Sequence, residues 1–478
     1  MTTTTSACFL HNEMASTWQW RIDTDPELAA SLGLLSKRRS KHALDPRSPA
    51  SFEKRLEWIQ RALWRMEEGL TPEQSSTLAE GDKLSYRLYM GQLRDYINYT
   101  TKHRAFLCCV NRLEGPQTDL PLYARYLPLK NKSHREFYKK FLEGVPVQLS
   151  EVMELLQIGL KEGRTPPSVS LDGVIDMIRA MIAGKMISFS GPISGDEVFD
   201  LPEEMDLKVE CMELVSKITE AFTKFADFLE KDYVHNLRTE ISAAKGYPEG
   251  ENYYRDCLTF HTTTDLSPTE IHQLGLDEVA RISKEMNEIA THAGYEGRLE
   301  GYMEYLRKNS KYEPTSADAL CAHYRDITGR IGPELLKIFH LKTLPRSPFS
   351  IVETPASQAS MAPAAYYLSG SIDSVAPRPG VFYVNTSELK TRRTYECEAL
   401  ALHESIPGHH TQAAIQNESE GLPDFRRYAE DRRYFEAPCR FPFYTGYIEG
   451  WGLHSGMCHN ANIYCCSVFQ HIRPHQFY

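Results

Sequence analysis

Three histidines and a glutamate stand close together near the end of the chain, in the segment His403-Glu404-Ser405-Ile406-Pro407-Gly408-His409-His410. Imidazole nitrogens are good zinc ligands, and a glutamate directly after the first ligand histidine is the usual general base for a metal-bound water. In the common helical arrangement the second histidine stands four residues after the first, on the same face. Here that position holds Pro407. The segment therefore indicates either a zinc site of altered spacing or three histidines that favour the dipole at a helix C-terminus.

The spacing decides which histidines could share one ion. On an unbroken helix His409 would point roughly 120° away from His403, and His410 would lie about 10 Å further along the axis. Pro407 cannot donate a helical hydrogen bond, and Gly408 tolerates unusual backbone angles, so this pair can bulge out of the helix. The two bulged residues then do not add to the rotation along the helix. His409 takes the position four residues after His403, on the same face. We predict His403 and His409 as zinc ligands with Glu404 as general base, and His410 as the second choice.

A third ligand must come from elsewhere in the chain. Glu449, in the segment YIEGWGLHSG, is the best candidate because a carboxylate among Tyr447, Ile448, Trp451 and Leu453 is paired or metal-bound if it is buried. Taken alone, an ordinary exposed carboxylate is the alternative interpretation. Three other acidic residues compete from polar, loop-like surroundings: Glu418, Glu420 and Glu430.

Helices are predicted for the first two-thirds of the chain. Apolar residues recur at spacings of three and four between Phe52 and Leu70, between Val209 and Leu229, and between Ile271 and Ile289. The last of these stripes follows Ser267-Pro268-Thr269-Glu270, which predicts a capping box with proline at the first helical position. We interpret all three stripes as faces that pack against a core.

A small sheet is predicted after residue 347, where short β-branched and aromatic runs alternate with proline, glycine and serine. The run Val381 to Asn385 is expected to be an edge strand that could align an extended peptide, followed by a helix from about Ser387 to Ile406. Tyr367, Tyr383 and Asn385 are the predicted substrate-lining residues.

Composition restricts the function classes. The 478 residues include 54 Lys and Arg against 64 Asp and Glu, a net charge of −10 that is mixed along the chain, so we expect no nucleic-acid partner. No run of about 18 apolar residues predicts a membrane span, and no secretory signal is expected at the start. The eleven cysteines form no CxxC pairs. We therefore expect a soluble, cytoplasmic protein with reduced thiols.

Several of these segments together resemble a known family. The run from His403 to Gln412, the later Glu449-Gly450-Trp451, the lead-in AAYYLSGSID…GVFYVN and the segment SPTEIHQLGLDEV resemble the domain-of-unknown-function family numbered 885. Its signature is His-Glu-x-x-Pro-Gly-His-x-x-Gln, then Glu-Gly-Trp, and the resemblance runs from about Pro26 to Leu453. It implies a mainly helical, zincin-like metallohydrolase, with a small sheet before the zinc helix, that is generally regarded as a peptidase. A more distant resemblance to helical zinc carboxypeptidases of the Taq type favours Glu449 as the third ligand.

The chain departs from this family pattern at its end. The second motif usually runs Glu-Gly-Trp-x-Leu-Tyr-x-Glu, but His454 and Gly456 replace the tyrosine and the last glutamate. Relatives normally continue with further helices, whereas this chain ends in an atypical tail, residues 457–478. We therefore expect a single domain over 22–456 that is incomplete at its C-terminal end.

Two classes of function follow from these observations. The first is a zinc metallopeptidase acting on a peptide or a small acyl or amide substrate, in which Glu404 activates a zinc-bound water and returns the proton to the leaving amine. Tyr366 or Tyr367 could then stabilise the oxyanion. The second is a truncated, catalytically silent isoform that acts as a binding or decoy protein.

Overall fold

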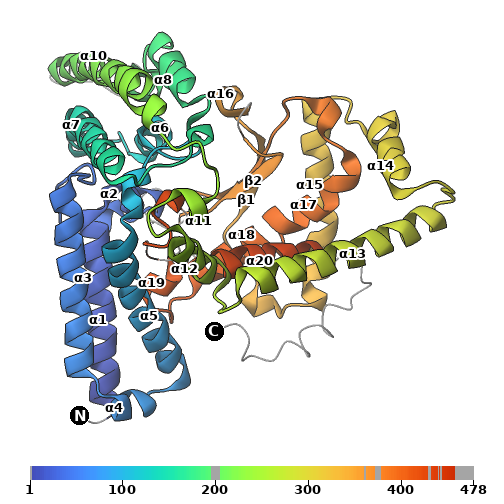
Figure 1. The fold of residues 1–478 in the computed structure, drawn as a ribbon, viewed down its shortest axis with the longest axis horizontal. Helices are drawn as coiled ribbons and strands as arrows, with labels where there is room; N and C mark the ends of the chain where they lie inside the picture. The colour runs from blue at the N-terminus through green and yellow to red at the C-terminus, as the bar shows by residue number, and fades with distance from the viewer. Residues whose placement is uncertain are drawn as a thin grey trace. The chain divides into compact units, whose positions relative to one another are not determined.

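The protein was analysed as a computed structural model, which describes residues 3–194, 205–359, 362–371, 378–428, 432–439, 441 and 444–457. These residues are mainly helical and include one small three-stranded sheet, which confirms the predicted fold class at this level. The chain divides into two compact units (Figure 1). The first contains the described residues within 1–257 and 420–443, and the second those within 258–372, 377–419 and 444–478. The single domain over 22–456 stays a prediction, and the predicted tail lies outside the described residues from residue 458 onward.

Helices build the first unit. They are α1 Thr3–Thr24, α2 Pro26–Ser31, α3 Pro49–Gly69, α4 Pro72–Ser76, α5 Glu80–His103, α6 Pro116–Tyr126, α7 Lys132–Glu162, α8 Val174–Ala183, α9 Ile187–Ser194, α10 Met205–Phe228, α11 Ala243–Gly246 and α19 Asp424–Arg427. Helix α12, Gly250–Thr262, continues from the first unit into the second.

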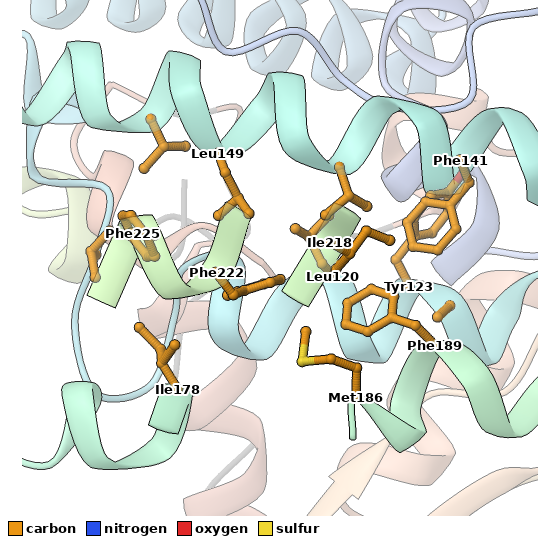
Figure 2. Close-up of a cluster of buried hydrophobic side chains, with 14 of the residues drawn as sticks. Leu120, Tyr123, Phe141, Leu149, Ile178, Met186, Phe189, Ile218, Phe222 and Phe225 are labelled. Carbon is orange, nitrogen blue, oxygen red and sulfur yellow. The ribbon is translucent and has the colours of Figure 1, made fainter. Parts of the chain in front are cut away.

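The main core of the first unit lies between α6, α7, α8, α9 and α10. Figure 2 shows Phe141 and Leu149 of α7 facing Ile218, Phe222 and Phe225 of α10. These five side chains are fully buried. The apolar stripe predicted on α10 is therefore a core face. Burying each such side chain contributes roughly 1.5–3 kcal/mol relative to leaving it exposed. The stripe predicted on α3 is also confirmed as a core face, through the buried Phe52, Ile59 and Met66.

The second unit combines helices with the sheet. Its helices are α13 Pro268–His292, α14 Leu299–Lys308, α15 Ala317–Glu334, α16 Ala356–Ala359, α17 Cys397–Glu404, α18 His409–Glu418 and α20 Thr445–Met457. Its strands are β1 Phe349–Glu353, β2 Ala365–Leu368 and β3 Gly380–Val384.

The sheet has the order β1-β3-β2, with β1 parallel and β2 antiparallel to β3. The small sheet was predicted, but the edge position of Val381–Asn385 was wrong because β3 is the central strand. The reason is topological: the chain returns from β2 and inserts β3 between the two earlier strands, an order that side-chain composition does not encode. The edge strands are β1 and β2, and β2 is the one nearer in sequence to the histidine motif.

The helix predicted from about Ser387 begins only at Cys397. The Asn385 side chain accepts the backbone N–H of Ser387 at 3.0 Å, and Glu388 follows with a left-handed φ of 53°. An asparagine that bonds two residues ahead favours a turn over a helix. Short 3-10 turns then carry the chain to the start of α17.

The apolar stripe on α13 is exposed, so its predicted role as a core face is wrong for the described residues. The predicted capping box between Ser267 and Glu270 is present. However, Leu274 is 52%, Val279 63% and Ile289 61% exposed. Helical periodicity shows which residues share a face, but not whether another element covers it.

The described helices differ in length and in apolar content. None of them is both long and apolar enough to span a bilayer.

Candidate metal centre

The histidine motif folds as two helices joined by a turn. His403 is the penultimate residue of α17, His409 is the first residue of α18, and residues 405–408 connect them. The Thr411 N–H donates to the Ser405 carbonyl at 3.3 Å, six residues back instead of the usual four. Two extra residues are therefore looped out, as the pair Pro407-Gly408 predicted. The two imidazoles meet with ring centroids 4.6 Å apart and planes at 83°.

Gly408 is required by the tightness of this turn. A Cβ atom added there would lie 1.9 Å from the His403 carbonyl oxygen and 2.3 Å from the Leu402 carbonyl oxygen. Both are backbone atoms, so no side-chain rotation could relieve the clash. The close return of the chain at Gly408 is what brings His409 beside His403.

Helix α20 supplies the third side chain. It packs against α17 and α18, the three helices lying side by side in Figure 1 (orange to red). The His403 Nε2 lies 3.3 Å and the His409 Nε2 3.7 Å from Glu449 Oε2. Gly452 allows this approach, because a Cβ there would lie 2.7 Å from Cε1 of the His403 ring. The structure thus brings together the three predicted ligands.

These distances fit a zinc ion. Two ligands bound at about 2.1 Å with tetrahedral angles stand ~3.4 Å apart, close to both nitrogen–oxygen distances. Two imidazoles and one carboxylate are a common donor set for zinc and leave a fourth position open. The neighbouring imidazoles of His403 and His409 lower the pKa of Glu449 to about 2, so this carboxylate is ionised, the form that binds a metal. The residues present therefore fit the predicted cofactor.

Glu404 lies beside the three ligand side chains without being one of them. It is buried, and burial raises its pKa against the opposing effect of His409 and His403. The backbone of Tyr367 on β2 is near enough to the Glu404 carboxylate to lower its pKa. Because Asn385 donates to the Ala364 carbonyl, the strand alternation turns the polar groups of Tyr367 away from β3. The free side of β2 therefore faces the Glu404 carboxylate.

His410 points away from the cluster. It is buried, its Nδ1 lies 3.0 Å from the Tyr367 hydroxyl, and its ring lies 4.6 Å from the ring of Phe349. Burial lowers its pKa to about 4, which keeps it neutral. His410 thus holds β2 against α18, and His409 is the histidine placed for a metal.

Of the three competing carboxylates, only Glu418 is a described residue of the second unit. Glu418 accepts the backbone N–H groups of Arg346 and Ser347, at 2.9 and 2.7 Å, and serves as a cap for that segment. Glu420 belongs to the first unit, and Glu430 lies outside the described residues.

The predicted substrate-lining residues have three different environments. Tyr383 stacks on Tyr366 at 4.9 Å between centroids, and both are half-buried. The hydroxyl of Tyr367 bonds His410. Asn385 is 1% exposed, and its amide donates to the carbonyls of Ala359 and Ala362. The structure therefore gives Asn385 a supporting role at the end of β3 in place of the predicted contact with substrate.

Sequence reasoning missed the contact that Trp451 makes. Its indole N–H donates to the Pro407 carbonyl at 2.8 Å and approaches the Gly408 carbonyl at 3.3 Å. Gln412, at the end of the histidine motif, donates to the Tyr447 carbonyl of α20 at 3.4 Å. The sequence contains one signal for these contacts: Gln412 stands in the histidine motif and Trp451 in the Glu-Gly-Trp motif. The structure brings these two motifs into contact.

Comparisons with known proteins place this geometry in a family. Two solved structures are similar to the chain. A candidate lipoprotein from Colwellia psychrerythraea matches with a TM-score of 0.78 and 22% identity, covering 96% of this chain and 79% of that one. A candidate lipoprotein of unknown function from Shewanella oneidensis matches with a TM-score of 0.56 and 13% identity, covering 94% and 76%. At these identities they show a shared fold.

No curated protein matched the chain. The family model described as "Bacterial protein of unknown function (DUF885)" matches residues 26–456, nearly the whole chain. The chain therefore belongs to the DUF885 family.

Proposed function

We propose that this protein is a zincin-like, zinc-dependent hydrolase that holds one Zn²⁺ through His403, His409 and Glu449. The observation that carries the proposal is the convergence of these three side chains from α17, α18 and α20 at zinc-like spacing. Two imidazoles and a carboxylate lie this close together either because they bind a cation or because they form a charged cluster. The adjoining buried Glu404, which is not needed as a ligand, favours a catalytic centre over a purely structural one.

The chemistry is divided between the metal and one carboxylate. Bound zinc would polarise a substrate carbonyl and acidify a water. Glu404 takes the proton of the attacking water and delivers it to the leaving group, the role of a general base that then acts as general acid. The hydroxyl of Tyr367 lies 3.0 Å from Nδ1 of His410, which argues against Tyr367 as the oxyanion donor.

Strand β2 favours a peptide as the substrate. It is an edge strand of four residues, Ala365–Leu368, and its outward side lies beside Glu404. On this side Ala365 has a backbone N–H and carbonyl that are not used by the β3 ladder. An extended peptide can add to such an edge by main-chain hydrogen bonds. This assigns to β2 the aligning role that had been predicted for β3.

Zinc-dependent cleavage of peptides tests the proposal. The purified chain is stripped with a chelator, reloaded with stoichiometric zinc and assayed on a mixture of fluorescence-quenched peptides, with His403→Ala as the matched variant. We expect turnover that follows the zinc content of the native chain and is absent in the variant. Zinc binding without turnover on any peptide would instead support the catalytically silent binding protein.

The cytoplasmic location is likewise proposed. The eight cysteines among the described residues are all free thiols, as a reducing compartment favours. Two of the similar solved structures are described as candidate lipoproteins, so a membrane location is the alternative for this chain. Fractionation of cells that express the native gene decides between the soluble cytoplasmic fraction and the membrane fraction.

A further inference from the structure

The turn between α17 and α18 determines where His409 lies, and two of its carbonyls face α20. The turn has no helical hydrogen-bond pattern, since Thr411 reaches past it to Ser405. Gly408 lies within it in an irregular conformation, with φ −74° and ψ −132°. A turn of this kind keeps one geometry only if other groups satisfy its backbone.

Trp451 satisfies it from the neighbouring helix. Its indole N–H donates to the Pro407 carbonyl at 2.8 Å and lies 3.3 Å from the Gly408 carbonyl. Gly408 is the residue directly before His409, and Trp451 stands two residues after Glu449 on α20. One side chain thus connects the helix that carries the third proposed ligand to the turn that directly precedes the second.

We propose that Trp451 is a positioning residue of the metal centre, which holds His409 in its ligand geometry through the carbonyls of Pro407 and Gly408. The inference rests on the proposed zinc site and adds to it a group that touches neither metal nor substrate. Removal of a group that orients a metal ligand costs about 10- to 100-fold in metal affinity in comparable sites. The indole hydrogen bond, and not the bulk of the ring, carries the effect.

Trp451→Phe tests this role, because it keeps an aromatic ring and removes the donor. Zinc affinity is measured by competition with a chromophoric chelator, and Co²⁺ absorption reports how many ligands remain. We expect Trp451→Phe to bind zinc about 10-fold or more weakly than the native chain, with a weaker tetrahedral Co²⁺ spectrum. Tyr447→Phe is the matched control on the same helix, since its exposed hydroxyl lies outside this contact, and it should bind zinc as the native chain does.

A double-mutant cycle separates positioning from general destabilisation. If Trp451 acts through His409, then Trp451→Phe should add no further loss of affinity in a His409→Ala background. An equal loss in both backgrounds, or native affinity in Trp451→Phe, would overturn the inference while leaving the zinc site intact. A native chain that binds no zinc would overturn the proposed function and this inference with it.

Discussion

The two glutamates of the site differ in what surrounds them, and this difference separates their roles. Glu449 is 54% exposed and lies 3.3 and 3.7 Å from two imidazole nitrogens, whereas Glu404 is buried and lies near the backbone of Tyr367. The surroundings of Glu449 suit the proposed ligand, and those of Glu404 suit the proposed general base. Loss of a base and loss of a ligand have distinct experimental signatures.

Glu404→Gln should keep the metal and lose the reaction. The amide is nearly the same size as the carboxylate, but it cannot take a proton. We expect unchanged zinc content and a fall in kcat of about 100- to 10,000-fold, the usual contribution of a general base. Metal analysis and peptide turnover on the same sample check this, and loss of zinc in the variant would mean that Glu404 is a ligand.

His409 and His410 are adjacent but should behave oppositely. His409→Ala removes a ligand and should weaken zinc binding by more than about 100-fold. His410→Asn removes a contact to Tyr367 away from the cluster, and should keep zinc binding at the cost of roughly 1 kcal/mol of stability. Isothermal titration with zinc distinguishes them, and the reverse pattern would refute the looped-out turn.

At the residue scale the sequence was informative because metal geometry is strict. His403 and His409 can bind the same ion only if Pro407 and Gly408 loop out of the helix. The turn could therefore be predicted from the spacing of the two histidines. The partner of His410 could not, since Tyr367 is 43 residues distant and the contact depends on how β2 packs. Trp451 could be recognised in the sequence as part of a motif. Its hydrogen bond to a carbonyl of the turn could not be predicted, because it depends on how α20 packs against that turn.

At the scale of elements, α20 approaches α17 through glycine. Gly452 lies against the His403 ring, and Gly456 lies 3.3 Å, measured from an added Cβ, from the Ala399 carbonyl. Glycines one helical turn apart let two helices pack closely, and this closeness brings Glu449 within reach of His403. Gly450, on the same helix, would meet nothing if it carried a Cβ.

Gly452→Ala and Gly450→Ala therefore form a matched pair. The first places a methyl group 2.7 Å from the His403 ring, which must move, so we expect about 10-fold weaker zinc binding and a loss of about 1–3 kcal/mol in stability. The second should leave zinc binding unchanged and stabilise the helix by up to about 1 kcal/mol. Zinc titration and urea unfolding of both variants measure these effects. Equal behaviour of the pair would show that the close approach is unimportant.

Helices could be predicted better than the sheet. The stripes of α3 and α10 and the capping box of α13 follow from local periodicity and local hydrogen bonds. The central place of β3 depends on which strands pair, and the exposure of α13 depends on what else the chain brings to it. Both are long-range facts that a local pattern does not contain.

At the scale of the whole molecule, the chain between the ligand helices leaves the second unit. Helix α18 ends at Glu418, the described residues within 420–443 belong to the first unit, and α20 begins at Thr445. That segment is held by a buried ionic cluster, in which Arg432 lies 2.8 Å and Arg433 2.9 Å from Asp25. The stability of the first unit therefore depends on charge pairs that acid can break.

Asp25 makes this dependence measurable. Burial raises the pKa of Asp25, but the combined opposing effect of Arg432 and Arg433 is larger. The pKa therefore lies well below its usual value. A carboxylate with a depressed folded-state pKa contributes stability above its unfolded pKa of about 3.9, and the contribution is lost as pH falls toward the folded value. We expect the free energy of unfolding to fall below about pH 5. Asp25→Asn should cost about 3 kcal/mol near neutral pH and flatten that dependence.

Urea unfolding at a series of pH values tests the prediction. Asp172→Asn, an exposed aspartate of the same unit, is the control and should follow the native chain throughout. If Asp25→Asn shows the native pH dependence, the ionic cluster is not what makes the first unit acid-sensitive.

Anomalous X-ray diffraction at the zinc absorption edge, from crystals of the native chain grown with zinc, tests the central claim most directly. We expect one strong anomalous peak per chain, about 2.1 Å from ligand atoms of His403, His409 and Glu449. A map with no peak at this position, or with zinc bound only at other residues, would contradict the account.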